Sequence, residues 1–131
     1  MTPLLQIKNL TITFDDHVLL DSLSIDINED QTLGLIGESG SGKSLTALAI
    51  LGLLPPTMKA SGEILFTPRH QPSISILQAS ESELSAIRGH YAAIVFQEPQ
   101  VALNPLMKIE KQLGRFVDSI EIDSLLNSVA L

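Results

Sequence analysis

The 131-residue chain is of single-domain size and is long enough to bury one hydrophobic core. Hydrophobic residues make up 44% and charged residues 18%, a globular composition that excludes a disordered chain. The net charge of −7 argues against a general nucleic-acid binder, and the absence of cysteine excludes a disulfide scaffold, a thiolate zinc site and a cysteine nucleophile.

Two strands are expected at the start of the chain. In residues 4–14 the apolar alternation changes phase partway along, which predicts a β-bulge near Lys8 and Asn9. Residues 22–28 alternate without a break between polar and apolar side chains, which indicates a half-buried antiparallel strand. The N-terminal part is therefore expected to form an antiparallel β subdomain.

The next segment combines a short strand with a helix. Residues 32–36 (TLGLI) are apolar in both phases, which predicts a strand buried on both faces, as in a parallel sheet. The helix after Lys43 is apolar on every side, so we expect it to be buried all round. Pro55 and Pro56 are expected to end this helix, because proline cannot continue it.

Further strands and a short helix follow. Residues 62–66 (GEILF) and 92–96 (AAIVF) predict strands, the second of them buried on both faces. Between them, Ser80 and Glu83 have the spacing of a capping box, which predicts that a helix begins there. Strand, glycine-rich loop, helix and further strands in this order are typical of an α/β fold.

Two helices are expected after residue 104, because apolar side chains recur there at helical spacing. The positions of the first face are Leu106, Ile109, Leu113 and Phe116, and those of the second are Ile122, Leu125, Leu126 and Val129.

Residues 37–44 (GESGSGKS) match the phosphate-loop pattern G-x-x-x-x-G-K-[ST], between an expected strand and an expected helix. Three glycines let backbone amides approach a polyphosphate, and the first amides of the helix favour an anion. Lys43 supplies a charge for the β- and γ-phosphates, and the Ser44 hydroxyl suits Mg²⁺. The alternative, a glycine-rich turn with a solvated lysine, does not account for eight matched positions in this context.

Four segments together resemble the ATP-binding subunits of ABC transporters, above all the dipeptide, oligopeptide and nickel importer branch. The resemblance covers residues 4–110 and implies a P-loop NTPase fold of the ABC ATPase type in incomplete form. Residues 1–110 would be the N-terminal half of the ATP-binding domain, and residues 111–131 a divergent helical tail. The segments are GESGSGKSLTALAILGLLP, GEILF, SELSAIRG and AAIVFQEPQVALNP.

The resemblance also implies roles for single residues. Phe14 matches the aromatic side chain that stacks on adenine, with an ordinary core residue as the alternative. Gln97 matches the Q-loop glutamine that contacts Mg²⁺ or the attacking water, and otherwise it is a polar loop residue. Glu98 and the loop after it resemble the surface that contacts a transmembrane subunit in this family, with a solvated carboxylate as the alternative for Glu98. The implied ATP contacts are Phe14, Gly37, Glu38, Ser39, Gly40, Ser41, Gly42, Lys43, Ser44, Leu45 and Gln97, and the implied Mg²⁺ ligands are Ser44 and Gln97.

The sequence departs from this family in its catalytic motifs. It contains no LSGGQ signature, and no run of four apolar residues followed by Asp-Glu occurs after Lys43. Residues 12–16 (ITFDD) mimic that run but precede the phosphate loop, so we interpret them as a chance match. None of the three histidines lies where the family has its switch histidine, and all are expected at the surface or in loops: His17, His70 and His90. We therefore predict no catalytic residue.

The predicted function is that of an ATP-binding component of a peptide or nickel importer, truncated to about half a domain. It is expected to bind ATP and Mg²⁺ without efficient hydrolysis of its own. The start of the chain lacks signal-peptide features and no apolar run approaches eighteen residues, which predicts a cytoplasmic protein. The expected partners are transmembrane subunits near Glu98, on the inner face of the membrane, and a second ATP-binding subunit, but no nucleic acid.

Three alternatives stay open. The chain could be a non-catalytic remnant, or a half-domain complemented by a separately encoded chain with the missing motifs. It could also be an unrelated phosphate-loop GTPase or small-molecule kinase. A GTPase would show N-K-x-D and D-x-x-G, and neither occurs. The lid of a small-molecule kinase would require several arginines, and the sequence has only three: Arg69, Arg88 and Arg115.

Overall fold

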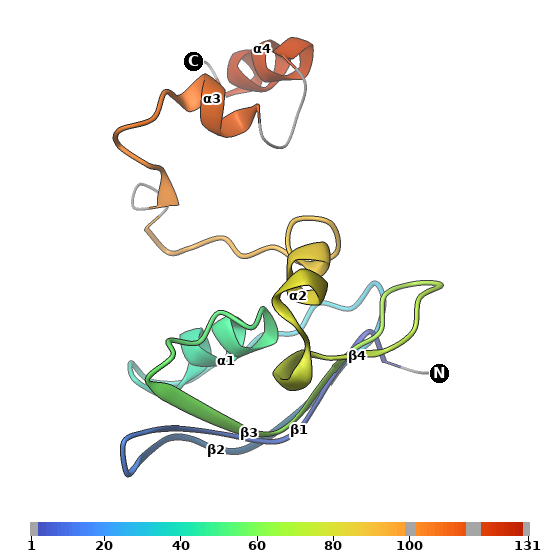
Figure 1. Ribbon diagram of the computed structural model, residues 1–131, viewed down its shortest axis with the longest axis vertical. Helices are drawn as coiled ribbons and strands as arrows, with labels where there is room; N and C mark the ends of the chain where they lie inside the picture. Colours follow the sequence, from blue (N-terminus) through green and yellow to red (C-terminus); the bar gives the residue numbers. More distant parts are fainter. Residues whose placement is uncertain (1–2, 99–101, 115–118, 130–131) are drawn as a thin grey trace. The chain divides into compact units, whose positions relative to one another are not determined.

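The computed structural model describes residues 3–98, 102–114 and 119–129. The chain divides into two compact units, Met1–Ile94 and Val95–Leu131. Within the described residues, the first unit contains a sheet, two α-helices and a short 3₁₀ helix, and the second contains two further α-helices (Figure 1).

The sheet of the first unit has four strands in the order β2-β1-β3-β4, and every neighbouring pair is antiparallel. A tight turn at Asp15 and Asp16 joins the two longest strands into a hairpin, and Asp15 has a left-handed φ of 49°. This turn gives the ITFDD run a structural explanation. The strands are β1 (Leu5–Phe14), β2 (His17–Ile27), β3 (Met58–Phe66) and β4 (Ile74–Ser75).

The predicted β-bulge in β1 is confirmed. The pairing of β1 with both neighbours is irregular after Ile7, and Asn9 has a left-handed φ of 49°. Ile7 is 1% exposed and Leu10 is fully buried, although they are three positions apart, an odd number that would place them on opposite faces of a regular strand. The irregularity therefore returns both halves of the strand to the same buried face. Gly62 of β3 lies so close to the Asn9 carbonyl that a Cβ would clash, which explains a glycine there.

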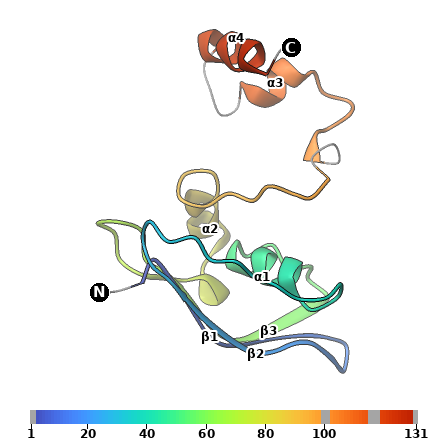
Figure 2. The same cartoon turned by 180° about the vertical axis from the view of Figure 1, so that it is seen from behind.

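One face of the sheet is covered by α1 (Lys43–Ile50), the 3₁₀ helix η1 (Ile76–Gln78) and α2 (Glu81–Ile87), which lie on the same side in both views (Figures 1 and 2). The side chains between these layers form one hydrophobic core, with β1 contributing the largest share. The most buried members are Leu5, Ile7, Leu10, Ile12, Ala49, Ile64, Phe66, Ile76, Leu84 and Ile87.

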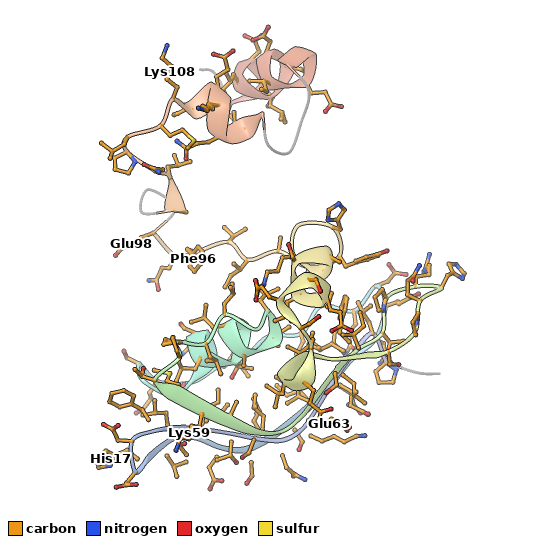
Figure 3. The ribbon with its side chains drawn as sticks, viewed as in Figure 1. His17, Lys59, Glu63, Phe96, Glu98 and Lys108 are labelled. Carbon is orange, nitrogen blue, oxygen red and sulfur yellow. The ribbon has the colours of Figure 1, made fainter. Side chains whose placement is uncertain are left out.

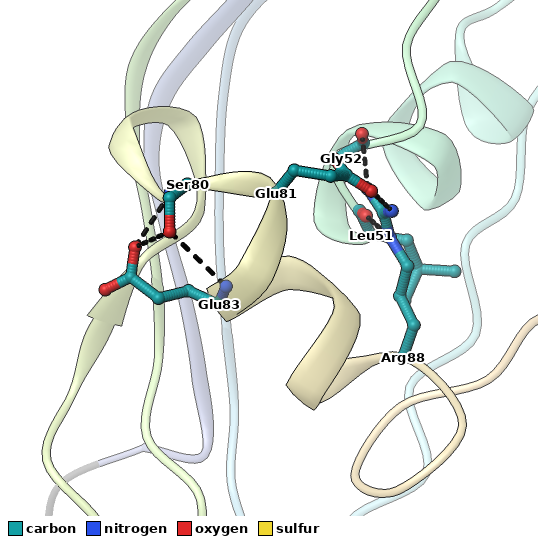
Figure 4. Close-up of polar contacts among 6 residues, drawn as sticks. All are labelled: Leu51, Gly52, Ser80, Glu81, Glu83 and Arg88. Atoms are coloured by element: carbon teal, nitrogen blue, oxygen red, sulfur yellow. Dashed lines mark hydrogen bonds and ion pairs between the residues drawn. The ribbon is translucent and has the colours of Figure 1, made fainter.

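Helix α2 begins as the sequence predicts. The Ser80 hydroxyl accepts a hydrogen bond from the Glu83 backbone N–H, and the Ser80 backbone N–H donates to the Glu83 carboxylate at 2.7 Å (Figure 4). This reciprocal pair is a capping box, and it satisfies amides that the first turn leaves unpaired.

Helix α1 is shorter and less buried than predicted. It ends at Ile50, before Pro55 and Pro56, because Gly52 adopts a left-handed φ of 62°. The Leu53 N–H donates to the Leu48 carbonyl and the Gly52 N–H to the Ala49 carbonyl, which is the Schellman pattern of a helix end. Within α1 only Thr46 and Ala49 are buried, so the prediction of burial on every side is wrong.

Two predicted strands are not formed. Residues 32–36 and 92–96 have no strand assignment, apart from an isolated bridge between Arg88 and Ala92. Ile36 is 97% exposed and Val95 91% exposed, so the prediction of burial on both faces is also wrong. A strand in the middle of a parallel sheet needs a neighbour on each side, and the described residues supply none for these segments.

The second unit contains α3 (Ile109–Leu113) and α4 (Ser119–Ser128), as predicted. The first helix begins after Leu106, which is 96% exposed, and Phe116 lies outside the described residues. The Gln112 amide group donates to the carbonyls of Asn104 and Met107 at 3.0 and 2.7 Å and thereby holds the turn before α3. Among the described helices of the whole chain, none has the length and apolar character to cross a membrane.

Candidate functional site: the loop at the start of helix α1

The phosphate-loop residues form a compact turn between β2 and α1. Residues 37–42 carry no helix or strand, and α1 begins at Lys43. The Ser41 N–H donates to the Glu38 carbonyl at 3.2 Å, which closes the turn. A Cβ at Gly37 would lie 2.5 Å from the Ser41 hydroxyl and 3.1 Å from the Ser41 Cβ, so a larger residue here would force the Ser41 side chain to move.

The last two glycines of the loop have left-handed backbones, with φ of 82° at Gly40 and 89° at Gly42. Other L-residues rarely adopt this conformation, because their Cβ approaches the following carbonyl oxygen. At Gly42 the space is also closed, since a Cβ would lie 2.9 Å from the Leu20 side chain of β2. This contact seats the start of α1 against the sheet, and Leu20 is a residue that sequence patterns did not single out.

The Lys43 side chain folds back over the loop instead of extending into solvent. Its ammonium donates to the carbonyls of Gly37 and Glu38 at 2.7 and 2.6 Å and to the Ser41 hydroxyl at 3.2 Å. These bonds place a positive charge at the centre of the turn. All three N–H donors of the ammonium are used by these bonds, so a phosphate oxygen that enters the loop would replace one of the loop acceptors.

The first turn of α1 is open to an anion. Its N-cap is Gly42, which has no side chain to bond the first amides, and the first turn contains no acidic residue. Ser44 is exposed at the second helical position, and its hydroxyl forms no hydrogen bond within the described residues. Unpaired amides and the positive end of the helix dipole favour a negatively charged ligand here.

Thr46 is a further residue that the motif did not reveal. It is 3% exposed, and its hydroxyl donates to the Gly42 carbonyl at 2.9 Å, alongside the Thr46 backbone N–H at 2.8 Å. The two bonds fix the Gly42 carbonyl on the helix side of the loop. A threonine one turn after the last glycine is the signal that could have identified it.

Phe14 lies at the end of β1, paired with His17 of β2 and with Met58 of β3, and it is 39% exposed. It follows Ile12 by two residues and so shares its sheet face, and Ile12 is paired with the Leu20 that contacts Gly42. Phe14 is therefore an exposed aromatic ring at the edge of the face on which the loop rests. Its predicted contact with adenine stays a prediction.

The remaining predicted ATP contacts divide between the two units. Glu38 and Ser39 are exposed in the loop, and Leu45 is half-buried in α1. Gln97 belongs to the second unit, so its predicted role beside Ser44 at Mg²⁺ stays a prediction. Glu98 is exposed next to it on a stretch without helix or strand (Figure 3).

The histidines lie where the sequence predicts. His17 is the first residue of β2, directly after the hairpin turn (Figure 3). His70 has a left-handed φ of 62° in the loop after β3, and His90 follows α2. All three are exposed. In the described parts of the chain, no group of three or more His, Asp or Glu side chains could hold a metal ion.

Comparison with known proteins agrees with the motifs. The family model for ABC transporters matches residues 20–131. The ABC transporter ATP-binding protein YejF of Escherichia coli, described as uncharacterized, is 46% identical over 84% of this chain and 21% of its own length. The oligopeptide transport ATP-binding protein OppD of Haemophilus influenzae is 39% identical over 86% of this chain and 35% of its own length.

The metal-staphylopine import system ATP-binding protein CntD of Staphylococcus aureus is 40% identical over 84% of this chain and 40% of its own length. The chain thus spans between a fifth and two fifths of the length of these relatives. The match confirms the α/β P-loop fold class and the resemblance to ATP-binding subunits of peptide and metal importers. The chain belongs to the ABC transporter family.

Proposed function

We propose that this chain is the nucleotide-binding portion of an ATP-binding subunit of a peptide- or nickel-class importer. The observation that carries the proposal is the loop of residues 37–44, with its Lys43 ammonium drawn over the turn and an uncapped helix behind it. Relatives named for oligopeptide transport and metal-staphylopine import support the transport class. Residues 1–110 would form the N-terminal half of the domain, and residues 111–131 a helical tail.

The residues present fit Mg²⁺-ATP. The first-turn amides of α1 and the amides of the loop would hold the β- and γ-phosphates, with Lys43 neutralising part of their charge. The Ser44 hydroxyl is a hard oxygen suited to Mg²⁺, and Gln97 would be a second ligand. Phe14 would stack on adenine, while Glu38, Ser39 and Leu45 would line the phosphates. Bound Mg²⁺ supplies positive charge to the phosphate oxygens.

We further propose that these 131 residues bind nucleotide without efficient hydrolysis of their own. Hydrolysis requires an oriented water and groups that stabilise developing charge. The sequence contains no LSGGQ motif and no apolar run followed by Asp-Glu after Lys43.

The proposed partners follow from the same family. Transmembrane importer subunits would contact the region near Glu98, and a second ATP-binding subunit would face the loop. This arrangement would place the chain on the inner face of the cell membrane. Co-purification with such subunits, lost in a Glu98→Arg variant, would support the contact.

Thermal unfolding with and without Mg²⁺-ATP tests the binding proposal. A ligand that binds only the folded state adds about 2.7 kcal/mol of stability at a hundredfold excess over Kd. We expect this shift in the parent chain and its loss in Lys43→Ala. The matched control is Lys59→Ala, because Lys59 is an exposed lysine on β3 of the same unit (Figure 3). If the thermal unfolding midpoint of the parent chain does not change with Mg²⁺-ATP, the proposal is refuted.

A further inference from the structure

The far end of α1 is held by a side chain that no motif assigns. The Schellman pattern at Gly52 uses the carbonyls of Leu48 and Ala49 and leaves those of the following residues available. Arg88, the C-cap residue of α2, donates hydrogen bonds to two of these carbonyls. Its Nε donates to the Leu51 carbonyl and its Nη2 to the Gly52 carbonyl, both at 2.8 Å (Figure 4).

The guanidinium is also fixed from its own helix. Nη1 of Arg88 donates to the Glu81 carboxylate at 2.6 Å, so all three nitrogens have a partner. The Arg88 side chain is 23% exposed and the Glu81 side chain 77% exposed. The carbonyl contacts are therefore the sheltered part of the network, and the ion pair is its exposed part, where solvent weakens it.

Packing reinforces these contacts. A Cβ at Gly52 would lie 2.8 Å from the Leu84 side chain of α2 and 3.3 Å from Nη2 of Arg88. Leu84 is 8% exposed and belongs to the core. The end of α1 is thus enclosed by Leu84 and Arg88, and α2 is in turn anchored by its Ser80–Glu83 capping box.

The start of the same helix forms the phosphate loop. Helix α1 has eight residues and is therefore about 12 Å long, so a rotation at one end moves the amides at the other. A cation at the last carbonyls also complements the helix dipole whose positive end faces the loop. We propose that Arg88 is a positioning residue for polyphosphate binding, because its hold on the Leu51 and Gly52 carbonyls fixes the first-turn amides of α1 in their binding geometry.

This inference rests on the proposed nucleotide binding, and its test separates the two. Arg88→Met keeps the apolar stem and removes all three donors, whereas Glu81→Gln removes only the charge of the exposed partner. Affinity for Mg²⁺-ATP and for inorganic tripolyphosphate is measured by calorimetry and corrected for the folded fraction. A purely stabilising role would change that fraction but not the corrected affinity.

We expect Arg88→Met to lower the corrected affinity for both ligands about tenfold, and Glu81→Gln to leave both affinities unchanged. Amide hydrogen exchange at residues 43–46 should be faster in Arg88→Met than in the parent. If Arg88→Met does not fold, Arg88→Lys decides the question. Lysine keeps the positive charge, but its single ammonium cannot bond two carbonyls as the forked guanidinium does. The affinity of Arg88→Lys for both ligands should therefore be lower than that of the parent, by less than tenfold.

Two results would overturn the inference while the proposed function stands. One is parent-like corrected affinity in Arg88→Met, or in Arg88→Lys where only that variant folds. The other is an equal loss in Glu81→Gln, which would assign the effect to the ion pair. A parent chain that binds neither ligand would refute the proposed function, and the inference with it.

Discussion

The first turns of α1 and α2 face the same physical problem in opposite ways. Both helices begin with backbone amides that have no partner inside the helix. In α2 the Ser80 and Glu83 side chains satisfy them, and two acidic residues complement the helix dipole. In α1 the N-cap is Gly42, no side chain caps the turn, and no acidic residue lies in it.

The difference in capping distinguishes a helix N-terminus that the chain itself satisfies from one that is open to a ligand. The amides of α2 are closed by the chain's own carboxylate, so an external anion would have to displace Glu83. The amides of α1 follow a loop that holds the Lys43 ammonium, and the turn contains no competing negative charge. We infer that the open turn exchanges self-capping for the ability to bind phosphate.

The sharpest way to break this comparison is to give α1 a carboxylate of its own. Ser44→Asp should abolish the rise in unfolding midpoint with Mg²⁺-ATP, because an anion then occupies the positive end of the helix. Without nucleotide the same variant should gain about 0.3–1 kcal/mol, since the carboxylate complements the dipole. Thermal unfolding with and without Mg²⁺-ATP measures both effects. The control is Ser44→Asn, which also lacks the Ser44 hydroxyl and has the shape of Asp without its charge, so the difference between the two variants reports the charge alone. A nucleotide shift of parent size in Ser44→Asp would contradict the interpretation of the open turn.

A second change tests the backbone on which the open turn depends. Gly42→Ala should lower the free energy of unfolding by about 1–2 kcal/mol, because the left-handed φ of 89° disfavours a Cβ. The new methyl group would also crowd the Leu20 side chain. Urea denaturation measures the loss. The matched control is Gly34→Ala, where a Cβ would meet no atom within 4 Å, and a similar loss there would refute the specific role of Gly42.

The smallest expected effect concerns the closed turn. Ser80→Ala should lower the free energy of unfolding by about 1 kcal/mol without changing the nucleotide shift. The Ser80 hydroxyl, and then its backbone N–H, lower the pKa of Glu83 below its ordinary 4.5, against a smaller opposing effect of desolvation. A carboxylate with a depressed folded-state pKa stabilises the fold above the unfolded pKa, and this contribution disappears as pH falls through the folded value.

The difference between parent and Ser80→Ala should therefore be constant at neutral pH and shrink once the pH falls below 4.5. Urea denaturation at several pH values measures this, with Ser85→Ala as the control because Ser85 is an exposed residue of α2 outside the cap. A difference that grows on acidification would rule out the capping box as its cause.

Local patterns predicted several elements correctly because their causes are local. The phase change in residues 4–14 predicted the β-bulge, and the spacing of Ser80 and Glu83 predicted the capping box. The predictions for residues 32–36 and 92–96 were wrong, since an apolar run forms a buried strand only when neighbouring strands and covering helices are present. The end of α1 was also misplaced, because Gly52 stops the helix before the prolines do.

By itself, the sequence determined the chemistry of the loop: the glycines, Lys43 and Ser44 at a spacing that suits a polyphosphate and Mg²⁺. Only the tertiary structure decided that Leu20 seats Gly42 and that Arg88 holds the opposite end of α1. The reason is physical. Motif residues interact over a few positions of the chain, whereas Leu20 and Arg88 act across 22 and 37 positions that only folding brings together.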